Sequence, residues 1–142
     1  MTIGRLIEGR DAAIVTCDAA ASVREAIALL AGRRIGALPV MENGTVAGIF
    51  SERDVIYRLQ QEGPAMLDRK VGDVMTKPAV TADRSMQVLV ALSLMTRRRI
   101  RHLPVVEDGK LVGFVSIGDL VKSRIDHIES EAEALRAYIQ TA

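Results

Sequence analysis

The sequence predicts a mixed α/β (α+β) fold in which one unit occurs twice. Residues 36–56 align without a gap with residues 101–121, at a constant offset of 65 positions. In each copy the hydrophobic period changes in the same order, which indicates a strand, a helix, two strands and a closing helix. Such a unit buries little apolar surface alone, so we expect the two copies to pack into one compact module.

The alignment keeps unlike residue types in register. Upstream of it, Val15-Thr16 matches Val80-Thr81 at the same offset. The other paired positions are Leu38 and Leu103, Pro39 and Pro104, Gly44 and Gly109, Gly48 and Gly113, Ser51 and Ser116, and Asp54 and Asp119. A repeated structural unit explains this pattern directly.

The first half of each unit has the pattern of a short strand and an amphipathic helix. Residues 13–16 form an apolar run that predicts the strand, and Ser22 is a typical N-cap for the helix. One helix face is apolar in both copies and should enter the core. Its residues are Val23, Ala26, Ile27 and Leu30 in the first copy, and Val88, Leu92 and Met95 in the second.

The second half of each unit has the pattern of a hairpin and a helix. Asn43-Gly44 lies between the β-prone runs 38–41 and 45–50, and this dipeptide tolerates the positive φ angles of a tight turn. Asp108-Gly109 repeats the signal in the second copy. The closing helix of each copy should begin near the serine that follows the second strand.

The pattern divides the chain into four parts. Residues 1–60 hold the first repeat with an N-terminal segment, and residues 61–70 form a linker that contains Gly63-Pro64. Residues 71–124 hold the second repeat, and residues 125–142 form a C-terminal amphipathic helix.

The C-terminal helix carries an apolar seam with alternating spacings of three and four residues. The seam consists of Ile125, Ile128, Ala132, Leu135 and Ile139. The other faces are charged, so the seam needs an apolar surface to cover it. That surface belongs either to this chain's own module or to a second subunit.

Bulk composition argues against nucleic-acid and membrane partners. Nineteen basic and 18 acidic residues give a net charge of +1, and only 3% of the residues are aromatic. A nucleic-acid interface usually needs a basic surface or aromatic side chains for stacking. We therefore interpret Arg97-Arg98-Arg99 as a solvated helix end or an anion-binding rim. The longest apolar runs fall far short of a bilayer span.

The sequence contains few of the residue patterns that an enzyme or a metal site needs. Cys17 is the only cysteine, which suits a reducing compartment, and His102 and His127 are the only histidines. Neither a metal-ligand spacing nor a nucleophile with a base partner is visible. The N-terminal residues carry charges where a signal peptide would be apolar. We expect a cytoplasmic protein that is not an enzyme and holds no metal.

The most informative motif is Gly-x-x-Ser-x-x-Asp, which ends at Asp54 in one copy and at Asp119 in the other. It joins a strand to a helix, whose first backbone N–H groups stabilise a phosphate, and the serine hydroxyl adds a donor. The glycine leaves room for a ligand. The aspartate can accept hydrogen bonds from both ribose hydroxyls. The motif therefore predicts nucleotide binding, with serine on the phosphate and aspartate on the sugar.

The same motif has a purely structural interpretation. Ser-x-x-Asp also resembles a capping box, which satisfies the helix end without a ligand. The preceding strand and glycine, present twice, favour the binding interpretation. The two are compatible, because a cap can open to admit a ligand.

The order of elements, the Leu-Pro-Val strand, the glycine turn and the Gly-x-x-Ser-x-x-Asp ending together resemble tandem cystathionine-β-synthase-type (CBS) domains. The resemblance covers nearly the whole chain, and residues 116–139 also resemble the tail of small stand-alone bacterial CBS-pair proteins. It implies two repeats packed about a pseudo-twofold axis, with two clefts for adenine nucleotides. AMP is the first expectation, and ATP, NADH and S-adenosylmethionine are the others.

The resemblance also implies that each cleft draws on both repeats. One cleft would combine Val15, Ile35, Gly36 and Ala37 with Ser116 and Asp119. The other would combine Thr76, Val80, Ile100, Arg101 and His102 with Ser51 and Asp54.

The two copies differ where a ligand would be selected. Gly36-Ala37 in the first copy stands against Arg101-His102 in the second, so the clefts should not be equivalent. Arg101 and His102 could contact a phosphate with charge-assisted hydrogen bonds, and Arg53 could reach the same region. Each could equally be a solvated side chain near a helix end.

We therefore expect a regulatory module that senses energy or redox state through an adenine nucleotide and modulates an unknown partner protein. A ligand can do so only if it binds two conformations with different affinity. Family members generally pair through helices, so a homodimer is expected. The alternative is a structural interaction module whose clefts stay empty and whose motifs serve only as caps.

Overall fold

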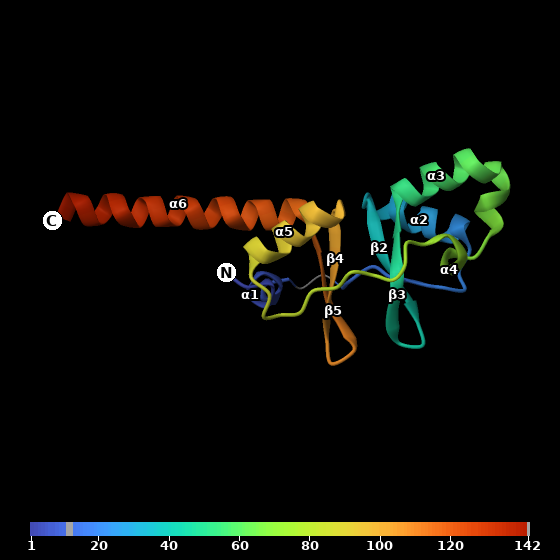
Figure 1. Ribbon diagram of the computed structural model, residues 1–142, viewed down its shortest axis with the longest axis horizontal. Helices are drawn as coiled ribbons and strands as arrows, with labels where there is room; N and C mark the ends of the chain where they lie inside the picture. The colour runs from blue at the N-terminus through green and yellow to red at the C-terminus, as the bar shows by residue number, and fades with distance from the viewer. Residues whose placement is uncertain (11–12, 142) are drawn as a thin grey trace.

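The computed structural model describes residues 1–10 and 13–141 (Figure 1). The last residue of the expected C-terminal helix, Ala142, lies outside the described residues. The elements in chain order are α1 Ile3–Glu8, β1 Cys17–Asp18, α2 Val23–Arg33, β2 Ala37–Glu42, β3 Thr45–Ser51, α3 Glu52–Glu62, the 3-10 helix η1 Gly63–Asp68, α4 Val71–Val74, α5 Val88–Arg98, β4 His102–Glu107, β5 Lys110–Ser116 and α6 Ile117–Thr141.

An antiparallel hairpin forms the centre of each repeat, as the turn dipeptides predict. β2 pairs with β3 and β4 pairs with β5, each pair with one register shift at the same place in the repeat. Both turns have two successive positive φ angles, 52° and 79° at Asn43-Gly44 and 51° and 77° at Asp108-Gly109. These angles are typical of a type I′ hairpin.

The opening strand of the first unit lies later in the chain than the sequence indicates. Residues 13–16 form no strand, and the pairing residues are those of β1, which runs parallel to β2 with Cys17 opposite Val40. In the second unit only Ala82 bridges to Val105 in the same parallel sense. A strand of two residues leaves no alternating pattern, so periodicity could not locate it.

The amphipathic helices α2 and α5 cover their hairpins as expected. Ser22 caps α2 by accepting a hydrogen bond from the Glu25 backbone N–H at 3.1 Å, and the Glu25 carboxylate accepts one from the Ser22 backbone N–H at 3.3 Å. The buried residues of the two helices are Val23, Ala26 and Leu30 in α2, and Val88, Ala91 and Met95 in α5.

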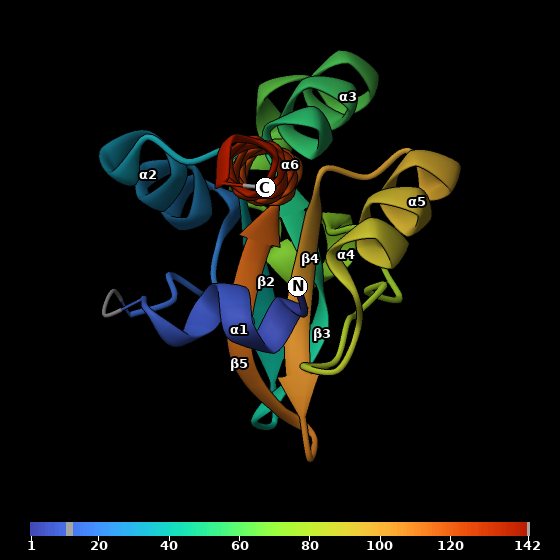
Figure 2. The same cartoon turned by 90° about the vertical axis from the view of Figure 1, so that its left-hand side faces the viewer.

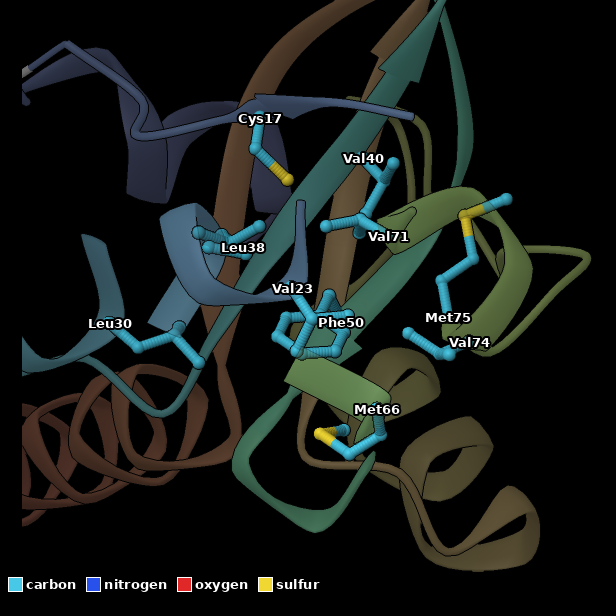
Figure 3. Packing of buried hydrophobic residues seen from close by; sticks show 11 residues of the cluster. Cys17, Val23, Leu30, Leu38, Val40, Phe50, Met66, Val71, Val74 and Met75 are labelled. Atoms are coloured by element: carbon cyan, nitrogen blue, oxygen red, sulfur yellow. The ribbon is translucent and has the colours of Figure 1, made fainter. Parts of the chain in front are cut away.

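Each repeat has its own apolar cluster. The first surrounds the fully buried Phe50 (Figure 3). The second surrounds residues of β4 and β5 together with Leu120 at the start of α6. Aliphatic and methionine side chains supply most of both clusters, as the low aromatic content requires.

Two short helices, α1 and α4, each pack against the repeat in the other part of the chain. Ile3 and Ile7 of α1 belong to the cluster of the second repeat, although α1 precedes the first repeat in the chain. Conversely, Val71, Val74 and Met75, at and just after α4, belong to the cluster of the first repeat (Figure 3). Each repeat is therefore completed by a short helical segment from the other part of the chain.

Backbone hydrogen bonds fix the two crossings in the same way. The N–H groups of Ile3 and Gly4 donate to the carbonyls of Met86 and Arg84 at 2.8 and 2.9 Å. The N–H groups of Val71 and Gly72 donate to the carbonyls of Ala21 and Ala19, also at 2.8 and 2.9 Å. The sequences IGRLI at residues 3–7 and VGDVM at residues 71–75 are therefore structural counterparts.

The two repeats lie side by side about an approximate twofold axis. β3 and β5 contact each other where the sheets meet. Figure 2 shows α2 and α5 on opposite flanks, with α3 and α6 at the same end of the strands, and Figure 1 shows that α3 and α6 run away from each other. The mixed α/β class and the paired repeats are thus confirmed.

The expected linker is ordered and packed. Residues 63–68 form η1, which contacts both α2 and α3. The side chain of Met66 has no exposed surface and joins the first cluster. The chain between the repeats is therefore held against the first repeat along most of its length.

The helix that closes the second repeat and the expected C-terminal helix form one continuous helix, α6. It runs outward from the body of the molecule (Figure 1), and Leu120 is its buried residue. The large seam residues are exposed, with Ile125 at 50%, Ile128 at 49% and Leu135 at 60%. The module of this chain therefore does not cover the seam. Across residues 1–10 and 13–141, no helix is both long and apolar enough to cross a membrane.

Gly48 is required where the chain after α4 crosses β3. A Cβ atom at this position would lie 2.6 Å from the Thr76 carbonyl oxygen and 2.7 Å from the Met75 sulfur. Gly32, in contrast, is a helical glycine with open space around it. We expect Gly48→Ala to lower the free energy of unfolding by about 1–3 kcal/mol through overpacking. Gly32→Ala should raise it by about 0.5–1 kcal/mol.

Urea unfolding of both variants measures these changes. Equal effects of the two substitutions would contradict the close crossing at Gly48.

Candidate functional site

Two clefts lie between the repeats, and each contains one copy of the Gly-x-x-Ser-x-x-Asp motif. The Asp54 cleft has a volume of about 300 Å³ and the Asp119 cleft about 430 Å³. Both fall within the range of roughly 300–1,000 Å³ that is usual for small-molecule sites. Gly36 and His102 line both clefts, so the two adjoin near the twofold axis.

The Asp54 cleft begins where β3 passes into α3. Asp54 Oδ2 accepts hydrogen bonds from the Ser51 backbone N–H at 2.9 Å and from the Ser51 hydroxyl at 3.2 Å. The Asp54 backbone N–H lies 3.4 Å from Ser51 Oγ, which completes a capping box. The structural interpretation of the motif therefore describes the contacts present here.

Thr76 adds a second partner to the Asp54 carboxylate. Its hydroxyl donates to Asp54 Oδ1 at 2.9 Å. The Thr76 backbone is fixed to β3 by two hydrogen bonds with Ile49, at 2.9 and 3.0 Å. The crossing after α4 thus places a hydroxyl donor directly beside the aspartate.

Three arginines line the Asp54 cleft. Arg53 comes from α3, and Arg99 and Arg101 come from the turn between α5 and β4. The Arg53 guanidinium donates to the Arg99 carbonyl at 3.4 Å. Glu52 and Asp54 are the two carboxylates of the lining. The arginines outnumber the carboxylates, which favours an anionic ligand.

The Asp119 cleft begins where β5 passes into α6. Asp119 Oδ2 accepts a hydrogen bond from the Ser116 backbone N–H at 2.8 Å, and the Asp119 N–H donates to Ser116 Oγ at 3.1 Å. Arg10 occupies the position that Thr76 has in the other cleft. Its Nη2 lies 3.1 Å from Asp119 Oδ2. The Arg10 Nη1 also donates to the Phe114 carbonyl at 3.1 Å.

Asp119 stays ionised under most conditions. Burial raises the pKa of this carboxyl, but the hydrogen bonds from Ser116 and Arg10, together with the Arg10 charge, lower it further than burial raises it. The net pKa lies below the ordinary value for aspartate. Asp119 therefore carries a negative charge, and Arg10 is its cationic partner.

His102 is a half-buried side chain between the two clefts. Its ring stacks on Phe114 with the centroids 5.4 Å apart and 13° between the planes. Burial is the main cause that lowers the pKa of His102, and the nearby charges of Asp119 and Glu52 only partly oppose it. His102 is therefore mostly neutral at pH 7 and can both donate and accept a hydrogen bond.

The structure brings the expected residues together in two groups. The Asp54 cleft contains Gly36, Ser51, Arg53, Asp54, Thr76, Val80, Ile100, Arg101 and His102. The Asp119 cleft contains Val15, Ile35, Gly36, Ala37, His102, Ser116 and Asp119. Their part in ligand binding remains a prediction.

Sequence reasoning missed other residues of both linings. In the Asp54 cleft these include Glu52, Tyr57, Pro78 and Arg99. In the Asp119 cleft the main one is Arg10, which lies 109 positions before its partner Asp119. The match between IGRLI and VGDVM was the available signal, because it places residues 8–10 opposite residues 76–78 of the other cleft.

Cys17 does not have the properties of a nucleophile. Its side chain is buried, and desolvation, with a smaller effect of the Asp18 charge, raises its pKa to about 11. The reactive form of a cysteine is the thiolate, which burial disfavours here. Within the described residues, no three His, Cys, Asp or Glu side chains are grouped as a metal site would require.

The model of the CBS domain matches the chain twice, at residues 10–61 and 71–126. The chain belongs to the CBS-domain family. Both matched segments contain one Gly-x-x-Ser-x-x-Asp motif, so this is a CBS pair.

Two curated CBS proteins resemble this CBS pair over most of its length. The mitochondrial CBS domain-containing protein CBSX3 of Arabidopsis thaliana is 36% identical over 92% of this chain, which spans 66% of that protein. The CBS domain-containing protein YhcV of Bacillus subtilis is 32% identical over 86% of both chains. Mycobacterial inosine-5'-monophosphate dehydrogenases also match, but the similarity covers 20% of the enzyme.

Solved structures of CBS proteins share the fold. A CBS-domain containing protein from Agrobacterium tumefaciens superposes with a TM-score of 0.82 at 36% identity, covering 87% of this chain and 99% of that one. The structure of CBSX2 in complex with AMP gives a TM-score of 0.74 at 28% identity, covering 88% and 96%. Relatives of this CBS pair therefore include an AMP-binding protein.

The depressed pKa of His102 makes the stability of the CBS pair depend on pH. The unfolded chain takes up a proton at the ordinary histidine pKa, whereas the folded chain does so only at lower pH. Between these two values the unfolded state binds more protons, so the free energy of unfolding falls as the pH falls. We expect His102→Gln to flatten this decrease as the pH falls through and below the ordinary histidine pKa of about 6.5.

Chemical denaturation at several pH values measures the slope. His127→Gln, on α6 outside both clefts, controls for the loss of an imidazole. A His102→Gln slope equal to that of the unsubstituted protein would contradict a buried neutral imidazole.

Proposed function

We propose that this CBS pair binds an adenine nucleotide in the Asp54 cleft and modulates a partner protein in response. The observation that carries the proposal is the group formed by Ser51, Asp54 and Thr76 at the start of α3, facing three arginines of the cleft. AMP is the expected nucleotide, and CBSX2, a relative with the same fold, has been solved with AMP. ATP, NADH and S-adenosylmethionine are the other candidate ligands.

Each part of the nucleotide has a matching surface. The N-terminus of α3 and the hydroxyl of Ser51 suit the phosphate, with Arg53 and Arg101 as charged partners. Asp54 suits the ribose, because a ribose hydroxyl can take the place of the Thr76 hydroxyl that now donates to it. Val80 and Ile100 supply apolar contacts for the base.

The regulatory step requires that the nucleotide favour one conformation of the module. A nucleotide in the Asp54 cleft would contact α3 and the turn before β4, which belong to different repeats. Binding there would restrain one repeat relative to the other and so change the surface offered to a partner. AMP or ATP as the ligand would make the CBS pair a sensor of cellular energy, and NADH would make it a sensor of redox state. We propose that this sensing takes place in the cytoplasm.

Neutralising Asp54 tests the proposal. Asp54→Asn keeps an acceptor for the helix cap but removes the negative charge that would hold the ribose. We expect the affinity for AMP to fall by about tenfold to a hundredfold, since hydrogen bonds to charged groups contribute about 1.5–3 kcal/mol. Isothermal titration calorimetry with AMP, ATP, NADH and S-adenosylmethionine measures binding.

Asp68→Asn is the matched control, because Asp68 pairs with Arg24 on the surface outside both clefts. An equal loss of affinity in both variants would argue against a ribose contact at Asp54. If none of the four ligands binds the unsubstituted protein, the motif is a helix cap and the CBS pair is a structural interaction module.

We also propose that the CBS pair forms a homodimer through α3 and α6. Both helices begin at the same end of the strands (Figure 2) but run away from each other (Figure 1), and both carry exposed apolar side chains. Those residues are Ile56 and Leu59 in α3, and Val121, Ile125, Ile128, Leu135 and Ile139 in α6. A second copy offers the same apolar surface, which suits a twofold interface.

A charge in the seam should disrupt that dimer. We expect Ile128→Glu to weaken dimerisation by about tenfold or more, because an unpaired carboxylate would be buried in the interface. Glu129→Gln, on a charged face of the same helix, is the control and should leave the dimer intact. Sedimentation equilibrium measures the association. A monomeric unsubstituted protein, or an unchanged Ile128→Glu dimer, would contradict the proposal.

A further inference from the structure

The two aspartates that would hold ribose have different partners. In the Asp54 cleft the neutral hydroxyl of Thr76 donates to the carboxylate at 2.9 Å. In the Asp119 cleft the guanidinium of Arg10 forms an ion pair with the carboxylate at 3.1 Å. In both motifs the serine backbone N–H donates to the aspartate carboxylate and the aspartate N–H faces the serine hydroxyl, so the residue from the crossing segment is the main difference at the acid.

The difference follows from the sequences of the two crossing segments. When IGRLI is aligned with VGDVM, Glu8 stands opposite Thr76 and Arg10 opposite Pro78. A glutamate cannot replace the hydroxyl donor of Thr76 when it is ionised, and a proline side chain cannot replace the guanidinium. The first cleft therefore has a neutral donor at its acid, and the second has a cation.

The fold holds Arg10 in place at several points. Its backbone N–H donates to the Ile7 carbonyl at 3.1 Å, at the end of α1. Ile3 and Ile7 of the same helix are buried in the second repeat. The guanidinium contacts both the Asp119 carboxylate and the Phe114 carbonyl. Arg10 is thus anchored by a packed helix, although its side chain is 37% exposed.

A ribose would compete differently for the two acids. At Asp54 a ribose hydroxyl would replace the Thr76 hydroxyl, which exchanges one neutral donor for another. At Asp119 the same hydroxyl would have to replace a guanidinium, whose charge-assisted hydrogen bond is about twice as strong as a neutral one. The displaced Arg10 would also lose its contact with Phe114 and would still line the cleft.

We propose that the contact between Arg10 and Asp119 is a latch that closes the Asp119 cleft to ribose. The CBS pair then binds a single adenine nucleotide per chain, in the Asp54 cleft. The proposal rests on the proposed function, because it assigns the same ligand to one of the two clefts. Arg10 is accordingly the residue that decides how many nucleotides the module takes.

Removing the latch should open the second cleft. We expect calorimetric titration with AMP to give about one site per chain for the unsubstituted protein and about two for Arg10→Ala and Arg10→Met. Arg10→Met keeps most of the side-chain length without the charge. Arg5→Ala removes an exposed arginine from the same helix and should leave one site.

A double variant locates the new site. Arg10→Ala combined with Asp54→Asn should retain one site, which would then be the Asp119 cleft. Thermal unfolding of each variant checks that it is folded. Two sites in the unsubstituted protein, or one site in both folded Arg10 variants, would overturn the latch.

If the proposed function is wrong, the binding data will differ from those expected for a failure of the latch alone. In that case neither the unsubstituted protein nor any variant would bind AMP or the other three ligands, and the latch would fall with it. Weaker binding in the Arg10 variants at the single site would instead make Arg10 a ligand contact and would also overturn the latch.

Discussion

The structure depends on an exchange of short helical segments between the two repeats. Backbone hydrogen bonds of 2.8 and 2.9 Å tie Ile3 and Gly4 to the second repeat, and bonds of the same lengths tie Val71 and Gly72 to the first. The apolar residues that follow each pair fill the cluster beneath it. Neither repeat has a complete core without its borrowed segment, so the two must fold into one module.

The exchange also makes the clefts. Because each borrowed helix crosses the edge of the other repeat, the residues after it arrive beside the acid of a motif. Thr76 reaches Asp54 in this way, and Arg10 reaches Asp119. Gly48 and Gly113 leave space for the crossings, since a Cβ atom at either one would lie less than 3 Å from the passing segment. The same packing therefore explains the stability of the fold and the difference between the clefts.

The sequence predicted those features that depend on local patterns. The hairpins follow from Asn43-Gly44 and Asp108-Gly109, and the start of α2 follows from its Ser22 cap, because the physical cause lies within a few residues. The grouping of residues into two clefts came from the resemblance to CBS domains. Periodicity could not have supplied it, since these residues are far apart in the chain.

The features that sequence reasoning missed or misplaced share one cause, which is long-range packing. The position of β1 depends on its pairing with β2, and the place of α1 depends on a repeat more than 70 positions away. The contact between Arg10 and Asp119 joins residues 109 positions apart. A short match such as IGRLI with VGDVM indicates such packing only after the longer repeat has been recognised.

The central claim is that a nucleotide binds between the repeats at Asp54. Backbone amide NMR spectra recorded during titration with AMP test it most directly, because each amide reports on its own surroundings. AMP bound at Asp54 should give the largest shifts at residues 51–54, 76 and 99–102, with much smaller shifts at residues 116–119. Shifts centred on residues 116–119, or no shifts at saturating AMP, would contradict it.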